Sequence, residues 1–437
     1  MKHIGLRAVY FAVFIICING FSFVSKAAER TLDYGKELVI VIDPGHGGEN
    51  EGTIEYGFLE KEMTLATATS MYEILSKFDD VKVYMTRTED VDLSLKQRAE
   101  FAKSVDADFL FSIHYNASVD HDLFGSEIWI SQFAPYNSYG VQFGDIFLNK
   151  MAEKGLFIRG IKTKQNKEGS DYYGIIRQSV KLDIPAVILE HCHVDEDRDN
   201  KYCRTLDQWY DFGKTDAYAV AEYFGLKSSL LNIDYSLNDY VYSEKNGQNE
   251  VTLNQKTPPD ICSVTLQDSD EEKGLLRVNV KGEDFDSLLM YYDYSYDGGL
   301  TYSKLMEWPG YNYFEKTYDS DFDLEIEIPS GIKPEVIVRC YNLFDDFTES
   351  NVIYYPRKFE YGNTGIKDSD KTIISGEDNV NVTVPESGIN TEKIKTFKNF
   401  LTLSLLSVSV LFLFLLIFLL LYKGGSGKKK NRRKKRH

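Results

Sequence analysis

Basic residues are too few in this sequence to balance the acidic ones. The 437 residues include 50 Lys and Arg against 67 Asp and Glu, which gives a formal net charge of −17. Twelve of the basic residues lie in residues 1–27 and 423–437, which contain no acid, so the stretch between carries −29. Such a surface argues against nucleic acid as a partner and against non-specific adhesion to anionic polymers. Hydrophobic residues make up 43%, enough for packed cores.

Long hydrophobic runs are confined to the two ends of the chain. A basic start, an apolar run and small residues after it make residues 1–27 typical of a secretory signal peptide. The second run, residues 400–422, carries no charge and is long enough to cross a bilayer as a helix. The basic residues at 423–437 predict that the C-terminus lies on the cytoplasmic side of the membrane, because loops and tails rich in Lys and Arg stay in the cytoplasm. We therefore expect a single-pass membrane protein with the bulk of the chain outside the cell.

Cysteine is also scarce, with five residues in the chain. Cys17 leaves with the signal peptide, and export permits disulfides between the other four. Pairing within each domain, Cys192 with Cys203 and Cys262 with Cys340, is the first expectation. Free buried thiols are the alternative, because connectivity cannot be read from sequence.

The body of the chain contains two textures. From residue 38 to 225, the apolar runs LVIVID, VKVYMT, DFLFSIH, SEIWIS and AVILE alternate with helical periods. This alternation predicts an α/β fold, with a mostly parallel sheet and flanking helices. Residues 258–356 show short alternating runs between Gly, Asp and Pro turns, which predicts an all-β sandwich of immunoglobulin or fibronectin III type.

Polar segments connect these two domains to each other and to the membrane. The predicted order is residues 1–27 for the signal peptide, 38–225 for the α/β domain, 226–257 for a linker or poorly packed extension, 258–356 for the β-sandwich, 357–397 for a flexible stalk, 400–422 for the transmembrane helix and 423–437 for the cytoplasmic tail.

VIDPGHGG, at residues 41–48, is the most informative motif. A Val- and Ile-rich strand leads into a Gly-rich turn that carries His46. Downstream, Glu60 opens a helical run, His114 ends the strand in FLFSIHYNA and Glu190 ends the strand in IPAVILE. Ligands of open α/β sheets bind at the carboxyl ends of the strands. Two His and one Glu are able to hold a catalytic zinc ion and leave a fourth position for water.

Several blocks occur together in one order: VIDPGHGG, EKE, TRTED with RAEFA, SIHYNA and IPAVILE. In this respect residues 38–225 resemble the zinc-dependent N-acetylmuramoyl-L-alanine amidases of the Amidase_3 family. The resemblance implies one zinc ion on His46, Glu60 and His114, with Glu190 as the catalytic carboxylate. It also implies peptidoglycan as the substrate, cut at the amide between N-acetylmuramic acid and L-alanine of the stem peptide.

The sequence departs from the family after Glu190, where HCHVDEDRDN replaces a Gly-Phe-like pair and an Asn. We expect this departure to change the wall of the substrate groove more than the residues that carry out the reaction. We expect His191 and His193 to be groove-lining or surface residues rather than a second metal site.

Other acidic and polar residues compete for roles in the site. Glu62 is an alternative ligand two residues from Glu60, and Glu62 or Glu127 is an alternative base. Asn116 and Arg177 are candidates for the substrate groove. Asn116 follows the His114 strand and is expected to orient its loop, and Arg177 has a groove role or a structural one.

Two other functions stay open at this point: a different peptidoglycan metallopeptidase and a non-catalytic cell-wall-binding surface protein. The β-sandwich contains no His, and its acidic residues are scattered over several strands rather than spaced as the ligands of a metal ion. We expect it to be a spacer or a binding surface for the wall or a protein partner. VPESG, at residues 384–388, precedes the second apolar run in the order of a sortase sorting signal, although Leu-Pro-x-Thr-Gly is absent. Attachment to the wall is therefore the alternative to a membrane anchor.

Overall fold

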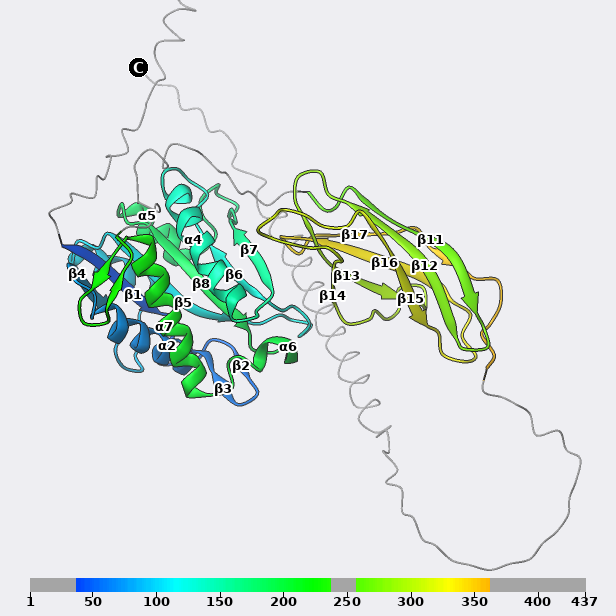
Figure 1. Cartoon of the computed structure of the whole chain (residues 1–437), viewed down its shortest axis with the longest axis horizontal. Coiled ribbons are helices and arrows are strands. Elements are labelled where there is room, and N and C mark those ends of the chain that lie inside the picture. Colours follow the sequence, from blue (N-terminus) through cyan, green and yellow to red (C-terminus); the bar gives the residue numbers. More distant parts are fainter. Residues whose placement is uncertain (1–36, 237–256, 362–437) are drawn as a thin grey trace, which may run out of the picture. The chain divides into compact units, whose positions relative to one another are not determined.

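The computed structural model describes residues 37–236 and 257–361, which belong to one compact unit of the chain (Figure 1). The predicted signal peptide, transmembrane helix, basic tail and VPESG segment lie outside these residues, as does nearly all of the stalk. Within the two described ranges, no helix is long and apolar enough to cross a membrane.

The first domain is built on a six-stranded sheet in the order β4-β1-β5-β8-β6-β7. Its strands are β1 Leu38–Pro44, β4 Val81–Met85, β5 Phe109–Asn116, β6 Ser126–Trp129, β7 Ile158–Lys162 and β8 Ala186–His193. Four of the pairings are parallel, and only β6 with β8 is antiparallel. The predicted α/β fold with a mostly parallel sheet is confirmed. The strand β7 was not predicted.

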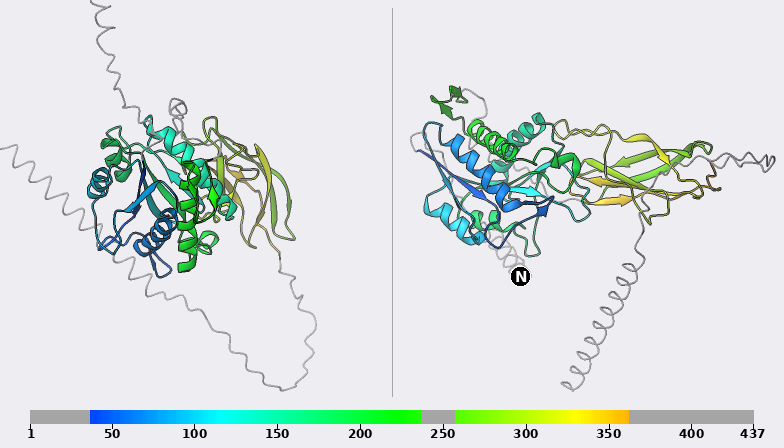
Figure 2. Two further views of the ribbon diagram at one scale, coloured as in Figure 1. Left: turned by 60° about the vertical axis from the view of Figure 1, so that its left-hand side comes forward. Right: turned by 90° about the horizontal axis from the view of Figure 1, so that it is seen from below.

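Helices cover both faces of this sheet (Figure 2). They are α2 Glu60–Leu75, α3 Leu95–Ser104, α4 Tyr136–Glu153, α5 Gly174–Lys181, α6 Asp197–Asn200 and α7 Leu206–Tyr223. Alternate strand residues point to opposite faces. Ile40 and Phe111 therefore join the buried cluster that includes α2, α4 and α7 residues, whereas Val41 and Leu110 join that of α3 and α5.

Side-chain caps explain where two of the helices begin. Ser94 and Gln97 form a reciprocal capping box at the start of α3, and Thr205 and Gln208 do the same for α7. Such caps satisfy N–H groups that a helix leaves unpaired at its first turn. The short hairpin of β2 Ile54–Glu55 and β3 Phe58–Leu59 lies just before α2.

The first domain extends past its predicted end. Residues after Leu226 form a two-stranded sheet, β9 Lys227–Ser228 with β10 Ile233–Asp234. Leu226, Ile233 and Tyr235 pack against the core of the α/β domain. Residues 226–236 are therefore an extension of the α/β domain, the second of the two alternatives for this polar stretch, but a packed one, because Leu226, Ile233 and Tyr235 find partners in the preceding domain.

The second domain, which we call the β-module, contains two antiparallel sheets. One has the order β11-β12-β15, and the other β14-β13-β16-β17 with β18 also paired to β16. The strands are β11 Ile261–Asp270, β12 Leu275–Glu283, β13 Leu289–Ser295, β14 Met306–Glu307, β15 Asp321–Glu327, β16 Glu335–Asn342, β17 Phe347–Glu349 and β18 Ile353–Tyr354. Phe359 is fully buried in its core, so the module runs beyond the predicted boundary at 356.

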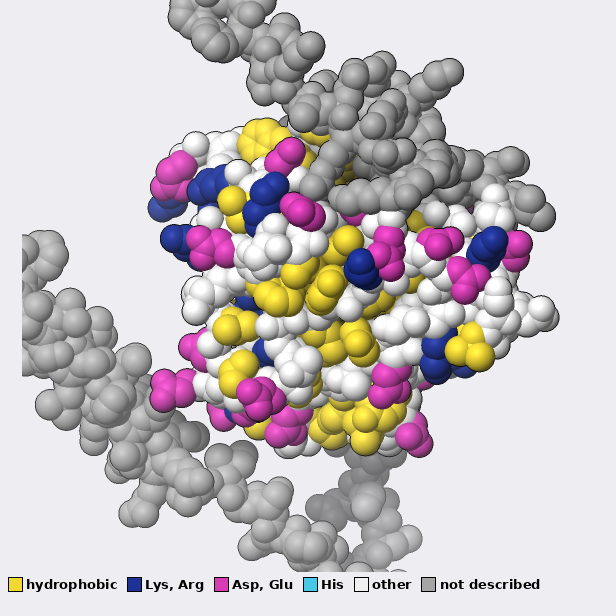
Figure 3. All heavy atoms as spheres, turned by 90° about the vertical axis from the view of Figure 1, so that its left-hand side faces the viewer, with side chains coloured by type: hydrophobic (Ala, Val, Ile, Leu, Met, Phe, Trp, Pro, Cys, Tyr) yellow, Lys and Arg dark blue, Asp and Glu magenta, His cyan; other side chains and the backbone are white. Residues whose placement is uncertain are grey.

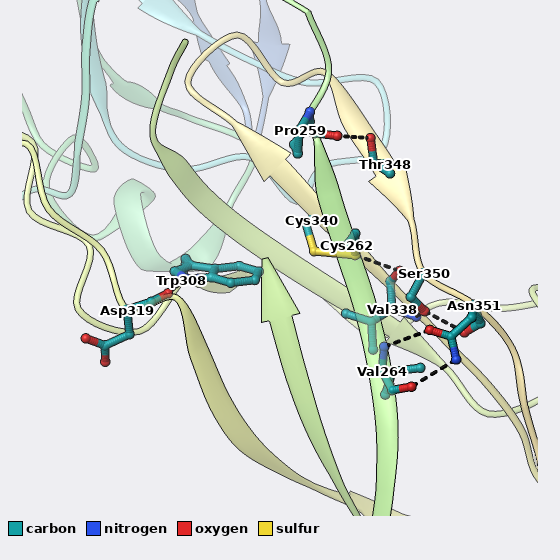
Figure 4. The surroundings of a disulfide bond; sticks show 10 residues. All are labelled: Pro259, Cys262, Val264, Trp308, Asp319, Val338, Cys340, Thr348, Ser350 and Asn351. Carbon is teal, nitrogen blue, oxygen red and sulfur yellow. Dashed lines mark hydrogen bonds between the residues drawn. A yellow bond between two sulfur atoms is a disulfide. The ribbon is translucent and has the colours of Figure 1, made fainter. Parts of the chain in front are cut away.

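A disulfide joins the two sheets of the β-module (Figure 4). Cys262 of β11 is bonded to Cys340 of β16, with 5.9 Å between their Cα atoms. Nearby, Val264 and the side chain of Asn351 exchange two hydrogen bonds of 3.0 and 2.9 Å. The predicted pairing in this domain is confirmed. In the α/β domain, Cys192 and Cys203 are free and buried, so the pairing expected there is wrong.

Candidate active site

His46 lies in the turn after β1 and has a left-handed backbone. Its φ is 62°, and Gly47 and Gly48 follow with φ of 127° and 60°. This conformation is costly for a residue other than glycine, at about 1–2 kcal/mol, so its surroundings must hold it. Nδ1 of the His46 ring lies 3.0 Å from Oδ1 of Asn50. This contact orients the ring and leaves Nε2 to face the other candidate ligands.

Two buried arginines hold this turn in place. Arg98 donates hydrogen bonds to the Asp43 carboxylate at 2.8 Å and to the carbonyls of Pro44 and His46 at 2.6 Å each. Arg87 donates to the Pro44 carbonyl at 3.1 Å. Burial, and then the charge of Arg98, lower the pKa of Arg87 to about 10. The strained turn is thus fixed from behind by charged groups on two other segments.

Glu60 begins α2 and is almost fully buried. One carboxylate oxygen accepts a hydrogen bond from the Thr53 N–H at 2.9 Å, and the other accepts one from the Tyr115 N–H at 3.1 Å. The second oxygen also lies 3.1 Å from Nε2 of His46 and 3.1 Å from Nδ1 of His114. Burial would raise the pKa of Glu60, but the two imidazoles lower it far below its usual range.

The three candidate ligands form one cluster. Their donor atoms all lie within 4.8 Å of one another, and no other group of at least three His, Cys, Asp or Glu side chains in residues 37–236 and 257–361 is this close. A Cβ atom at Gly45 would lie 2.3 Å from the His114 ring, so this position needs glycine. Glu62 is exposed and lies outside the cluster. The structure therefore groups Glu60, rather than Glu62, with His46 and His114.

Glu190 lies on β8, between strands that carry two other residues of the site. Its partners in the sheet register are His114 on β5 and Glu127 on β6. Its Oε2 atom is buried and has no hydrogen-bond partner among the described residues. Burial, and then the charges of Glu60 and Glu127, raise the pKa of Glu190 well above its usual range. A carboxyl with raised proton affinity is suited to general acid/base chemistry.

Glu127 has the opposite environment. Its carboxylate lies 2.7 Å from Nε of Arg159 and 2.8 Å from Nζ of Lys162, both on β7. The side chains of Asn116 and Trp129 donate to its other oxygen at 2.8 and 3.0 Å. Although burial opposes it, the charges of Lys162 and Arg159 lower the pKa of Glu127 far below its usual range. Glu127 is therefore held as an anion and is a poor candidate for the base.

The two residues predicted for the substrate groove have different surroundings. Asn116, at the end of β5, uses its side-chain oxygen to accept the N–H of the next residue at 2.9 Å, so it shapes the following loop. Arg177, in α5, donates to the carbonyls of Asp171 and Tyr172 at 2.6 and 2.7 Å. These bonds give Arg177 a structural role in the described fold.

His191 and His193 are buried, so the expectation that they line a groove or the surface is wrong. Nδ1 of His191 lies 3.0 Å from the carbonyl oxygen of His114, and Nε2 lies 2.9 Å from the Asp216 carboxylate on α7. Nδ1 of His193 lies 3.1 Å from the Gly125 carbonyl oxygen. Both rings have hydrogen-bond partners that are distant in sequence, and His191 ties the His114 strand to a helix.

One face of the molecule mixes both signs of charge. Acidic and basic side chains are interspersed there around an area of hydrophobic ones (Figure 3). No histidine is visible among its coloured atoms. Where this face is coloured, it shows no extended basic area.

The first domain matches known proteins. The model of the N-acetylmuramoyl-L-alanine amidase family, Amidase_3, matches residues 40–222. N-acetylmuramoyl-L-alanine amidase CwlM of Bacillus licheniformis is 30% identical over 191 residues, which are 44% of this chain and 70% of the relative. The probable N-acetylmuramoyl-L-alanine amidase AmiB of Haemophilus influenzae is 34% identical over 120 residues, which are 27% of this chain and 26% of the relative.

Two solved structures have similar sequences. The catalytic domain of CwlV, an N-acetylmuramoyl-L-alanine amidase from Bacillus (Paenibacillus) polymyxa var. colistinus, is 28% identical with a TM-score of 0.38 and covers 44% of this chain and 99% of its own. Cwp6 from Clostridium difficile is 29% identical with a TM-score of 0.40 and covers 43% of this chain and 29% of its own. On the family match and the coverage of CwlM, the chain belongs to the N-acetylmuramoyl-L-alanine amidase family.

Proposed function

We propose that this chain hydrolyses the amide between N-acetylmuramic acid and L-alanine with one zinc ion on His46, Glu60 and His114 and with Glu190 as general acid/base. The amidase activity and the peptidoglycan substrate follow from the family. One observation carries the mechanism: three donor atoms lie within 4.8 Å of one another, and Glu190, the register partner of His114 on the next strand, has a buried carboxylate oxygen without a hydrogen-bond partner in the described residues.

The residues present fit zinc. Two imidazoles and one carboxylate are a donor set of catalytic zinc sites, which keep one position open. His46 has the outer contact that a histidine ligand requires, because Asn50 faces its second ring nitrogen. When bound, zinc polarises a carbonyl oxygen and lowers the pKa of water from 15.7 to about 7.

Glu190 performs the proton transfers in this proposal. Its Oε2 atom has no competing hydrogen bond in the described fold, and the raised pKa of the side chain favours proton uptake. It accepts a proton from the attacking water and returns it to the nitrogen of L-alanine, which leaves as a neutral amine. Groups of this kind contribute about 10²- to 10⁴-fold to a rate.

Zinc dependence is tested on the full exported part of the chain, residues 28–397. We expect about one zinc ion per chain, in line with the single site proposed for catalytic zinc. A chelator should abolish the activity and added zinc should restore it. Glu60→Gln should lose zinc, whereas the matched control Glu62→Gln should keep both zinc and activity because Glu62 is exposed. Undiminished hydrolysis by metal-free protein would remove the proposed mechanism.

The bond that is cut separates this proposal from its alternatives. Mass spectrometry of digested peptidoglycan should show free stem peptides that begin with L-alanine and glycan strands without peptides. A stem-peptide metallopeptidase would instead shorten the peptides, and a wall-binding protein would release nothing.

Export and a membrane anchor form the second part of the proposal. They are supported by the sequence of residues 1–27, 400–422 and 423–437 alone. Cell fractionation is expected to find the protein with the membrane and accessible from outside. Release by wall digestion, with loss of the tail at VPESG, would favour sortase attachment instead.

A further inference from the structure

The β-module covers the outer edge of the amidase sheet. The edge strand β7 has β6 as its one neighbour in that sheet. Between β14 and β15, Tyr311 donates its hydroxyl to the Ile158 carbonyl at 2.6 Å, and the Tyr313 hydroxyl accepts the Ile161 N–H at 3.1 Å. Unpaired groups on an edge strand need cover or they recruit another strand. Here the module supplies that cover.

Close packing accompanies these hydrogen bonds. Gly160 of β7 has φ of 100°, and a Cβ atom there would lie 2.4 Å from the Tyr313 ring. Glycine is required both for this backbone and for this approach. Beside it, Phe124 of the amidase domain shares a buried hydrophobic cluster with Tyr291 and Leu305 of the module. The interface between the amidase domain and the β-module is therefore packed as closely as a hydrophobic core.

The same contact completes a cluster of charges in which both cations and Glu127 are buried and Asp345 is partly exposed, at 32%. Arg159 donates to both carboxylate oxygens of Asp345, at 2.8 and 2.6 Å, and to Glu127 at 2.7 Å. Nζ of Lys162 lies 2.8 Å from Glu127 and 3.5 Å from Asp345. The side chains of both cations are 1% exposed. Removing such charges from water is costly unless each finds its counter-charge, so the two cations need both carboxylates.

This cluster reaches the proposed catalytic residue through Glu127. Glu127 and Glu190 are direct partners on antiparallel strands. Like charges in that relation repel each other. The ion pairs of Arg159 and Lys162 with the Glu127 carboxylate offset this repulsion. Glu127 also accepts the hydrogen bond that holds Asn116, two residues beyond His114.

We propose that Asp345 of the β-module is a positioning residue for the amidase reaction. It lies in the turn between β16 and β17 and holds Arg159 and Lys162 against Glu127. Glu127 in turn holds the strands beside Glu190 in register. The inference rests on the proposed role of Glu190. It gives the module, through Asp345 alone, an effect on the amidase reaction in addition to the role of spacer or binding surface expected from the sequence.

Asp345→Asn tests this role in the full exported chain, because it removes one charge and keeps the side-chain shape. On a soluble N-acetylmuramoyl peptide, kcat should fall at least about tenfold, since small misplacements of reacting groups cost up to about 10²-fold. KM should stay within about twofold, because Asp345 is not proposed to bind the substrate. The zinc content should not change. Asp345→Glu should recover part of the lost kcat, because it restores the charge.

Asp268→Asn is the matched control. It removes a carboxylate that pairs with Arg277 at 2.9 Å in an exposed position of the same module. Exposed pairs contribute little, so its kcat should equal that of the wild type. Wild-type kcat in Asp345→Asn would overturn the inference. So would a loss of kcat that only follows a loss of folded protein and that Asp345→Glu does not repair. A wild type without zinc-dependent activity would overturn the proposed mechanism instead.

Discussion

Replacing Glu190 by Gln is expected to lower activity and raise the stability of the zinc-free protein. The amide keeps the shape of the side chain but cannot take up a proton from water. Turnover should therefore fall by about 10²- to 10⁴-fold. Each tenfold loss corresponds to about 1.4 kcal/mol on the barrier, so the expected cost is about 3–5 kcal/mol.

The gain in stability follows from the raised pKa of Glu190, which burial causes first and the charges of Glu60 and Glu127 second. The unfolded chain has the ordinary glutamate pKa of about 4.3. Because the folded state binds the proton more tightly, wild-type stability falls as pH rises from about 4 towards the raised pKa. Every tenfold difference in proton affinity is worth about 1.4 kcal/mol at higher pH. Removing that cost should raise Tm.

Thermal unfolding of zinc-free wild type and Glu190→Gln, at pH 5 and pH 7.5, measures this difference. The variant should have the higher Tm, and its advantage should be larger at pH 7.5. Glu62→Gln, an exposed change near the start of the same helix as Glu60, should alter stability by less than about 0.5 kcal/mol. Near-normal turnover in Glu190→Gln would show that the base is elsewhere. A lower Tm would show that the Glu190 carboxylate does not destabilise the folded protein.

Three further perturbations test the scaffold. Arg98→Ala leaves the Asp43 carboxylate buried without its cation, so the free energy of unfolding should fall by about 3–5 kcal/mol and zinc should be lost. Denaturant unfolding and metal analysis measure these two changes. A variant as stable as the wild type would contradict the role of the ion pair. Reduction of Cys262–Cys340 should lower the stability of the chain by about 2–5 kcal/mol, and an unchanged unfolding midpoint in reductant would refute this. Gly160→Ala should lower both Tm and kcat because the added methyl group would clash with the Tyr313 ring of the β-module. Wild-type values for both would show that the interface rearranges at little cost.

The sequence was most informative where the signals are local. The strand that leads to His46, the acid at the start of α2 and the strand that carries His114 each lie in a recognisable run of apolar residues, and the first of them ends in a glycine-rich turn. Because parallel strands present their carboxyl ends at one edge, these separate motifs could be expected to meet. Glu190 could be placed on its strand for the same reason.

The strand β7 could not be predicted because its composition is determined by distant residues. It contains Gly160 and Lys162, which are poor strand formers on local grounds, and it lacks the alternation of apolar and polar residues that marks a half-buried strand. Arg159 is paired with Asp345, 186 positions further along the chain. Gly160 is needed by a tyrosine ring of the next domain. No local pattern contains those partners, so neither the strand nor the contact between domains could be read from the sequence.

The cysteines show the same limit in another way. Cys262 and Cys340 lie on strands of facing sheets and are bonded, whereas Cys192 and Cys203 are buried thiols. Both pairs were equally plausible from spacing and compartment. Only the direction of each side chain in the fold distinguishes them.

The tyrosine cover on β7 determines where a recombinant enzyme can be truncated. A fragment that ends at residue 236 presents the bare edge of β7 as a template for strand addition by a second copy. It also leaves Arg159 with one counter-charge instead of two. Light scattering should show concentration-dependent growth of such a fragment, whereas a fragment that ends at residue 361 should stay monomeric. Equal behaviour of the two would argue against the cover. We therefore expect the folding unit of this chain to extend beyond residue 222, where the family match ends.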